Sequence, residues 1–139
     1  MLLGNHADKR PEIKLGLRCE AKRDFIAEID EDYFKQVIHN LVLNGIQSIE
    51  GSGSVTVNLS YSIQINRFIV EIVDTGKGIS EEVRKDLFKP FFTTRSKGIG
   101  LGLNISMKIS EKHGWEISHK PSSPKGSVFT LQIPLSSKN

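Results

Sequence analysis

Asp74-Thr75-Gly76-Lys77-Gly78 and Gly98-Ile99-Gly100-Leu101-Gly102-Leu103-Asn104-Ile105-Ser106 are the stretches that decide the fold. The first follows an apolar run at residues 68–73, which predicts a strand with Asp74 at its end and a glycine turn behind it. The second opens a predicted helix, where N–H groups that no Cβ covers attract phosphate. The two glycine clusters therefore predict a polyphosphate ligand.

The composition is that of an ordinary globular domain. The chain has 139 residues, of which 37% are apolar and 25% charged. No stretch approaches the roughly 18 apolar residues of a membrane span, and the N-terminus is unlike a signal peptide, so we expect a cytoplasmic protein without direct membrane contact. Lys and Arg are scattered among acids, which does not favour nucleic-acid binding. We expect a tail or linker at 1–12, one domain at 13–135 and a polar tail at 136–139.

The single cysteine, Cys19, excludes an internal disulfide and a cysteine metal cluster. It continues an alternation with Ile13, Leu15 and Leu17, which predicts a strand whose apolar residues lie in the core.

Periodicity predicts two helices among several strands. The first helix follows an N-cap at Asp30 and runs to residues 46–48, with Phe34, Ile38, Leu41 and Gly45 on its apolar face. The second covers residues 99–112 and ends at His113-Gly114. The strands are expected at 13–19, 25–29, 55–62, 67–73, 115–119 and 127–133, with a hairpin turn at 64–66.

Four amide side chains share one stripe of the first helix: Gln36, Asn40, Asn44 and Gln47. Apolar neighbours flank this stripe, which indicates a partly covered groove. An amide oxygen suits Mg²⁺, which prefers oxygen ligands and keeps several waters when it bridges phosphates. The alternative is that these amides are ordinary polar residues of a helix surface.

Four segments together resemble a known family. Residues 40–45, Asp74-x-Gly76-x-Gly78, residues 88–94 and residues 98–103 are similar, in order and spacing, to the N, G1, F and G2 boxes of the ATP-binding catalytic domain of sensor histidine kinases. The resemblance covers roughly residues 13–134. It implies the α+β Bergerat fold of the gyrase, heat-shock-90 and mismatch-repair ATPases, a two-layer sandwich with helices on one face of a mixed, mostly antiparallel sheet. The compact lid is similar to that of nitrogen-regulator kinases.

The resemblance implies roles for three residues above all. Asn44 matches the asparagine that holds Mg²⁺ against the triphosphate of ATP. Asn40 stands where related ATPases place a glutamate as general base, and an amide cannot take a proton at neutral pH. Both are thus the implied catalytic residues, and phosphoryl transfer to a protein nucleophile is favoured over hydrolysis. Asp74 matches the carboxylate that accepts the adenine amino N–H.

The other implied nucleotide contacts come from the same boxes and the lid. Glycines let the backbone approach the base and receive the phosphates, Arg95 or Lys97 assists them, and either Ser127 or Thr130 of the last box faces the adenine. The segment 80–97 is expected to be a mobile lid that ATP orders. The full implied set is Asn40, Asn44, Gln47, Asp74, Gly76, Gly78, Ile79, Phe91, Thr93, Thr94, Arg95, Lys97, Gly98, Gly100, Leu101, Gly102, Leu103, Ser127 and Thr130.

The phosphoacceptor is missing from this sequence. Sensor kinases phosphorylate a histidine followed by an acidic residue, and none of the four histidines here, at 6, 39, 113 and 119, has that setting. The resemblance therefore implies a monomeric catalytic fragment that acts on a separate dimerisation and phosphoacceptor domain, and indirectly on a response regulator. Two positions depart from the family pattern: Gln47 stands where a Lys is common, and Ile99 stands where Thr or Ser is common. A non-catalytic nucleotide-binding module therefore stays open, as does, less favourably, a related ATPase or serine kinase.

Overall fold

The computed structural model describes residues 12–19, 29–89 and 99–135. Within these ranges the chain forms one five-stranded sheet in the order β1-β2-β3-β5-β4, with three helices. The strands are β1 (Ile13–Cys19), β2 (Gly53–Ser62), β3 (Arg67–Asp74), β4 (Glu116–Pro121) and β5 (Ser127–Pro134), and the helices are α1 (Glu31–Gln47), α2 (Glu81–Arg84) and α3 (Ile99–His113).

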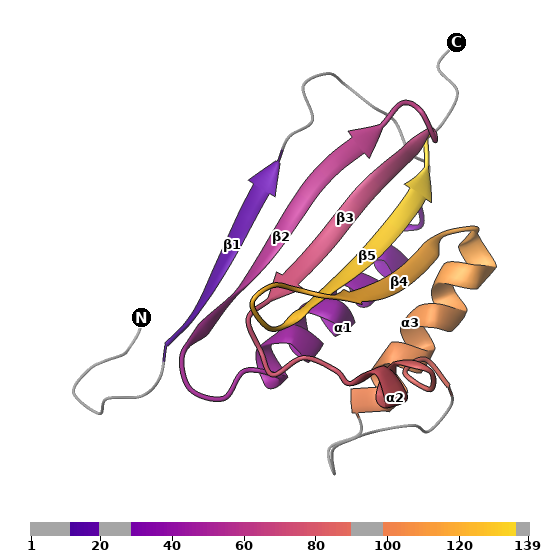
Figure 1. Ribbon diagram of the computed structural model, residues 1–139. Helices are drawn as coiled ribbons and strands as arrows, with labels where there is room; N and C mark the ends of the chain where they lie inside the picture. Colours follow the sequence, from indigo (N-terminus) through magenta and orange to yellow (C-terminus); the bar gives the residue numbers. More distant parts are fainter. Residues whose placement is uncertain (1–11, 20–28, 90–98, 136–139) are drawn as a thin grey trace.

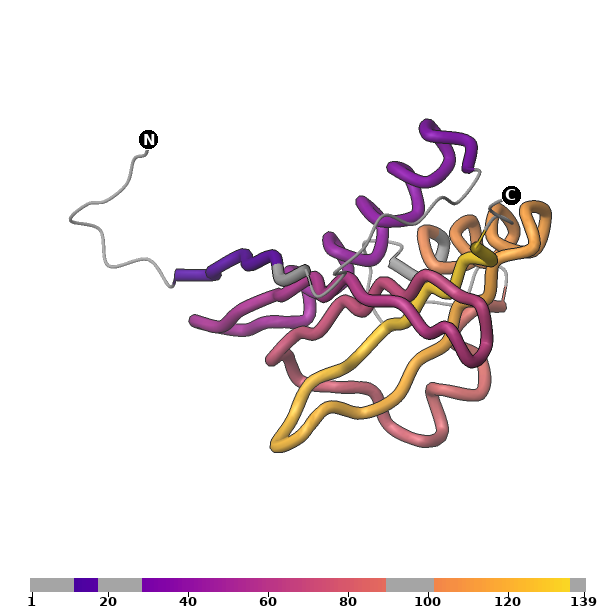
Figure 2. Tube along the Cα trace, turned by 90° about the horizontal axis from the view of Figure 1, so that it is seen from above, coloured from indigo at the N-terminus to yellow at the C-terminus, as the bar shows by residue number. Residues whose placement is uncertain are grey.

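Strand pairing is parallel only at one edge of the sheet. β1 runs parallel to β2, whereas the pairs β2–β3, β3–β5 and β4–β5 are antiparallel. Figures 1 and 2 show α1 and α3 side by side on the same face of the sheet. The expected two-layer α+β sandwich with a mixed, mostly antiparallel sheet is confirmed.

Helix α1 begins where the sequence predicts. The Asp30 carboxylate accepts hydrogen bonds from the N–H groups of Asp32 and Tyr33, which satisfies donors that the helix itself leaves open. The buried face of α1 is rotated from the predicted one, however. Val37 and Asn44 are buried with Leu41 and Gly45, whereas Phe34 and Ile38 are only partly buried. The cause is α3, which packs against the side of α1 that carries the amides.

Helix α3 ends at a glycine, as predicted. Gly114 takes a φ of +76°, which glycine adopts without strain. Its N–H donates to the Glu111 carbonyl (3.3 Å) and the Trp115 N–H donates to the Ser110 carbonyl (2.8 Å), so the last carbonyls of the helix are satisfied. Trp115 then enters the core at 4% exposure.

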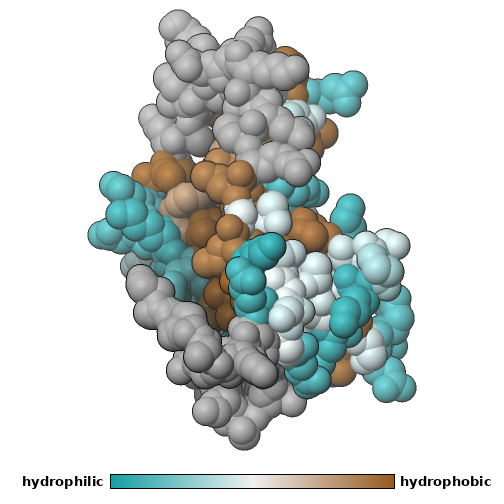
Figure 3. Space-filling model, turned by 90° about the vertical axis from the view of Figure 1, so that its left-hand side faces the viewer, coloured by the Kyte–Doolittle hydropathy of each residue, from teal (hydrophilic) through white to brown (hydrophobic). Residues whose placement is uncertain are grey.

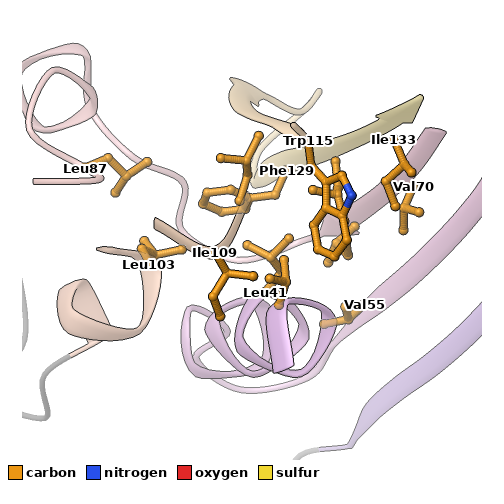
Figure 4. Close-up of a cluster of buried hydrophobic side chains, with 13 residues drawn as sticks. Leu41, Val55, Val70, Leu87, Leu103, Ile109, Trp115, Phe129 and Ile133 are labelled. Carbon is orange, nitrogen blue, oxygen red and sulfur yellow. The ribbon is translucent and has the colours of Figure 1, made fainter. Parts of the chain in front are cut away.

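The core lies between α1, α3 and the inner face of the sheet (Figure 4). Phe129 on β5 is fully buried at its centre, and Leu41 of α1 and Ile72 of β3 are equally shielded. Burial of each such side chain contributes about 1.5–3 kcal/mol relative to leaving it exposed. This core fixes the C-terminal end of β3, and with it Asp74, beneath the two helices.

The prediction that the apolar residues of β1 lie in the core is wrong. Leu15 and Leu17 are 64% and 72% exposed, because β1 is the edge strand and the helix layer does not cover it. Figure 3, which looks at this edge, shows apolar surface there. The side chain of Cys19 is outside the described part of the chain. The strand predicted at 25–29 also falls outside it, apart from Ile29, which is not in a strand.

The first half of the segment expected to form the lid packs against the sheet. Ser80 caps α2 by accepting the Val83 N–H (3.3 Å), Leu87 is 5% exposed in the core, and Phe88 meets Phe129 edge-on with ring centres 6.2 Å apart. Residues 80–89 are therefore anchored to the sheet through apolar packing. The remaining lid residues fall in 90–98, outside the described ranges.

Candidate functional site

A buried carboxylate lies at the centre of the candidate site. Asp74, the last residue of β3, is 1% exposed and is paired with Val55 on β2 and Ser127 on β5. Its Oδ1 accepts three hydrogen bonds, from the Gly76 N–H (2.8 Å), the Ser48 hydroxyl (3.2 Å) and the Ser127 N–H (3.3 Å). Its Oδ2 is buried without a partner among the described residues.

The environment of Asp74 favours a donor at this second oxygen. Burial raises the pKa of the Asp74 carboxyl, and the donors on Gly76, Ser48 and Ser127 only partly offset that rise. Leaving a buried acceptor unmatched costs about 1–3 kcal/mol. A ligand N–H at Oδ2 would remove this cost and would also stabilise the ionised form.

Two glycines allow the backbone to close around Asp74. A Cβ on Gly76 would overlap the Ser48 hydroxyl, and a Cβ on Gly126 would overlap the Asp74 carbonyl oxygen. Gly126 also has a φ of +108°. Gly78 lies against the backbone of Gly126. Any side chain at Gly76 or Gly126 would therefore displace the groups that hold the carboxylate.

The amide stripe on α1 is divided between packing and solvent. Asn44 is 9% exposed and belongs to the buried face, whereas Gln36 and Gln47 are exposed. Asn40 is half-buried, and its Nδ2 donates to the Gly102 carbonyl (3.3 Å) and to the Ser106 hydroxyl (3.1 Å). The Asn40 side chain thus ties α1 to the first turns of α3.

The sheet register separates the two candidate residues of the last box. Ser127 is paired with Asp74 and is 3% exposed. Thr130 is paired with Glu71 and Ser118, and strand alternation puts it on the opposite face of the sheet from Asp74. Of these two residues, only Ser127 lies at the candidate site.

The remaining predicted contacts have mixed positions. Ile79 packs against the core, and Leu103 is 2% exposed inside it, so Leu103 serves packing. Gly100 lies in the first turn of α3, and nothing is described for the side chain of Leu101. The following predicted residues lie outside the described ranges: Phe91, Thr93, Thr94, Arg95, Lys97 and Gly98.

Two residues that sequence reasoning missed complete the site. Ser48, just after α1, donates to Asp74, and no local pattern in the sequence signals this contact. His119 on β4 lies with its Nε2 2.8 Å from the Ser127 Oγ. The alternation of His119 with the buried Ile117 could have indicated that it faces inward.

Metal and membrane features are sparse in the described part of the chain. Residues 12–19, 29–89 and 99–135 contain no group of three or more His, Cys, Asp or Glu side chains placed to hold a metal ion. The same residues include no helix with the length and apolar character needed to cross a bilayer. The side chain of Asn44 carries an amide oxygen, which is a type of ligand that Mg²⁺ accepts.

Comparisons with known proteins agree on the family. Residues 29–137 match the family described as histidine kinase-, DNA gyrase B-, and HSP90-like ATPase. The sensor histidine kinase ZraS of Salmonella typhi is 40% identical over 108 residues, which cover 78% of this chain and 23% of ZraS.

Two solved structures have the same fold. The nucleotide-free catalytic domain of histidine kinase ThkA aligns with a TM-score of 0.75 and 31% identity, over 88% of this chain and 78% of that one. ThkA in complex with the response regulator TrrA aligns with a TM-score of 0.70 and 31% identity, over 88% of this chain and 34% of that one.

Proposed function

The chain belongs to the family of histidine kinase-, DNA gyrase B- and HSP90-like ATPases, and from that premise we propose that it is the Mg-ATP-binding catalytic domain of a sensor histidine kinase. It donates the γ-phosphate of ATP to a histidine on a separate domain. The matched residues span only 23% of the relative ZraS. In this proposal the phosphoacceptor histidine lies on a domain outside that span.

The observation that carries this proposal is the buried Oδ2 of Asp74, which has no partner among the residues that the structure describes. A buried acceptor beside a saturated Oδ1 suits one N–H donor, and the exocyclic amino group of adenine supplies it. Gly76 lets the chain pass close to Ser48, which also donates to Asp74, because a Cβ on Gly76 would overlap the Ser48 hydroxyl. Asp74 therefore orients the base and excludes purines that present a carbonyl at the same position.

The phosphate end of the ligand is assigned to α1 and the start of α3. The positive end of the α3 dipole and the N–H groups of its glycine-containing first turn favour phosphate oxygens. In this proposal Asn40 and Asn44 of α1 lie beside the phosphates, and an amide oxygen is an acceptable neutral ligand for a magnesium ion. When bound, Mg²⁺ neutralises charge on the triphosphate.

Asn40 separates kinase from hydrolase chemistry. Its amide cannot act as a base, and its Nδ2 is already engaged with Gly102 and Ser106. No described residue at this position can therefore activate water for attack on the γ-phosphate. In this proposal the nucleophile comes from a partner, and a histidine of a dimerisation domain fits that role. A response regulator, such as the one bound to ThkA, would then receive the phosphoryl group.

The test is transfer in trans. The chain is mixed with labelled Mg-ATP and the purified dimerisation and phosphoacceptor domain of the parent kinase. Label should appear on the acceptor, and its acid lability with stability in base would identify phosphohistidine. Without acceptor, phosphate release should stay near the uncatalysed level.

The second candidate is a non-catalytic nucleotide-binding module. Gln47 favours it, because this exposed residue stands at a position where the family often has Lys. Tight ATP binding without any transfer would establish that module and overturn the kinase proposal. Brisk release of phosphate by the chain alone would instead indicate an ATPase.

A further inference from the structure

A chain of contacts leads from Asp74 to a histidine that the proposed chemistry does not use. The Ser127 N–H donates to Asp74 Oδ1 (3.3 Å), and the Ser127 hydroxyl lies 2.8 Å from His119 Nε2. The His119 ring packs against Phe129, with ring centres 4.9 Å apart. All four side chains lie on the inner face of the sheet, where the register pairs Asp74 with Ser127 and Phe129 with His119.

The protonation of the ring can be argued from its other nitrogen. His119 Nδ1 is buried and has no partner among the described residues. A buried N–H without an acceptor is rarer in proteins than an acceptor without a donor. The tautomer with its proton on Nε2 therefore fits the site better, because it leaves only a lone pair at Nδ1. In that tautomer Nε2–H donates to the Ser127 oxygen.

The surroundings keep the ring neutral. Burial, and then the positive charge of Arg84, lower the pKa of His119 to about 4. Arg84 is held close because its Nη2 donates to the His119 carbonyl (2.8 Å), while its Nη1 pairs with Glu81 (3.3 Å). A neutral ring can be either a donor or an acceptor at Nε2, so its tautomer decides what Ser127 presents to a ligand.

We propose that His119 is a positioning residue for the base: it donates to Ser127, and so turns the Ser127 hydroxyl proton toward the ligand beside Asp74. The inference rests on the proposed function, because it names a determinant of base selectivity within the same site. Asp74 Oδ2 then offers an acceptor and Ser127 a donor, the latter directly or through one water.

This pair of groups matches one purine edge. Adenine presents an amino donor at C6 next to the acceptor N1, so both of its groups are satisfied. Guanine presents a carbonyl at C6 next to N1–H, so both of its groups meet a like partner. A site built to hydrogen-bond one pattern rejects the other strongly, because buried polar groups are left unpaired.

The experiment removes one ligand atom at a time. Calorimetry compares ATP with 1-deaza-ATP, which lacks the N1 acceptor, on the unaltered chain and on His119→Phe and Ser127→Ala. The unaltered chain should bind ATP about tenfold tighter than 1-deaza-ATP, the value of one hydrogen bond. Both variants should bind the two nucleotides equally. His113→Phe is the matched control: His113 is also half-buried, but its Nδ1 lies 2.9 Å from the Ile109 carbonyl oxygen and its ring stacks on Trp115, not on a residue of the candidate site.

The outcomes separate this inference from the proposed function. A chain that binds no ATP overturns both. ATP binding without discrimination against 1-deaza-ATP, or discrimination that persists in His119→Phe, overturns only the role of His119. A second measurement uses only the unaltered chain, so it does not require that any variant folds. The ¹⁵N shifts and long-range ¹H–¹⁵N couplings of His119 in the unaltered chain should report the Nε2–H tautomer, and an Nδ1–H tautomer would contradict the proposal.

Discussion

The proposed base end and the proposed phosphate end of the site are constructed in different ways. At the base end, Asp74 is fixed by strand register and by two backbone N–H groups, from Gly76 and Ser127, with the Ser48 hydroxyl added. At the phosphate end, Asn40 and Asn44 project from one helix, and Asn40 also braces a second helix. At the proposed base end, one carboxylate is held mainly by backbone N–H groups. At the proposed phosphate end, two amide side chains of α1 accompany the backbone N–H groups in the first turn of α3.

This difference determines what a substitution changes. A carboxylate that three donors hold in place keeps its orientation when its chemistry is altered, so changes at Asp74 should alter which base binds. Changes on α1 should alter how strongly the phosphates and metal bind, and also how α1 packs on α3. The predictions below test this division.

The largest expected effect is at Asp74. In Asp74→Asn, the three donors to Oδ1 hold the amide oxygen in place, so the NH₂ group replaces Oδ2 and opposes the adenine amino group. ATP affinity should fall by about 100-fold, while GTP should lose little, because the cost of an unpaired buried polar group is about 1–3 kcal/mol per group. Calorimetry with both nucleotides measures this. An equal loss for ATP and GTP would mean that Asp74 supports only the fold.

The next effect is at Asn44. Asn44→Ala removes the amide that we assign to magnesium, so Mg-dependent ATP affinity should fall about tenfold while the ATP-to-GTP ratio stays unchanged. Since Asn44 is 9% exposed, thermal melting has to accompany the titration. Gln36→Ala, an exposed amide of the same helix, is the control. Equal Mg-ATP affinity in the unaltered chain and Asn44→Ala would exclude the metal role.

A smaller effect concerns pH and selectivity. Burial raises the pKa of Asp74, and a base donor at Oδ2 requires the ionised carboxyl. ATP affinity relative to GTP should therefore be constant above that raised pKa and fall severalfold as the pH drops through it. Protonation of the phosphates affects both nucleotides alike, so it cancels in the ratio of ATP affinity to GTP affinity. A ratio that stays flat while the Asp74 carboxyl becomes protonated would argue against a role for the ionised form, and Asp74→Asn should show no such pH dependence.

The smallest effect concerns the stability of the free protein. Burial, and then the charge of Arg84, lower the pKa of His119 to about 4 in the folded chain, against 6.5 for an ordinary histidine. Between these values the unfolded chain binds the proton first, so this residue lowers stability as the pH falls from about 6.5 to 4. Over that pH window, the melting temperature of His119→Phe should fall less than that of the unaltered chain. The difference should be about 4–8 °C for each kcal/mol of destabilisation that the substitution removes. Identical pH dependence would show that His119 is not held neutral.

Much of the fold could be predicted because its signals are local. Asp30 caps α1, the glycine at 114 ends α3, and alternation marks β2 and β3. The exposure of Leu15 could not be predicted in this way, because alternation does not tell an edge strand from a covered one. Likewise, the helical wheel of α1 placed the amides on one stripe, but it could not show which of them α3 would cover.

The candidate site shows the same limit at closer range. Asp74 is marked by its place between a strand and a glycine turn. Its partners Ser48 and Ser127 lie 26 and 53 residues away in the sequence, so only the folded sheet brings them together. The choice between Ser127 and Thr130 likewise required the register of β3 with β5.

The most direct test of the account is a pair of titrations of the unaltered chain with ATP and with GTP, at the same magnesium concentration and pH 7.5. The account predicts that ATP binds at least about 100-fold more tightly, because guanine would leave two buried polar groups facing like partners. Equal affinities would contradict it, since they would show that the phosphates alone hold the nucleotide and that the buried carboxylate of Asp74 does not recognise the base.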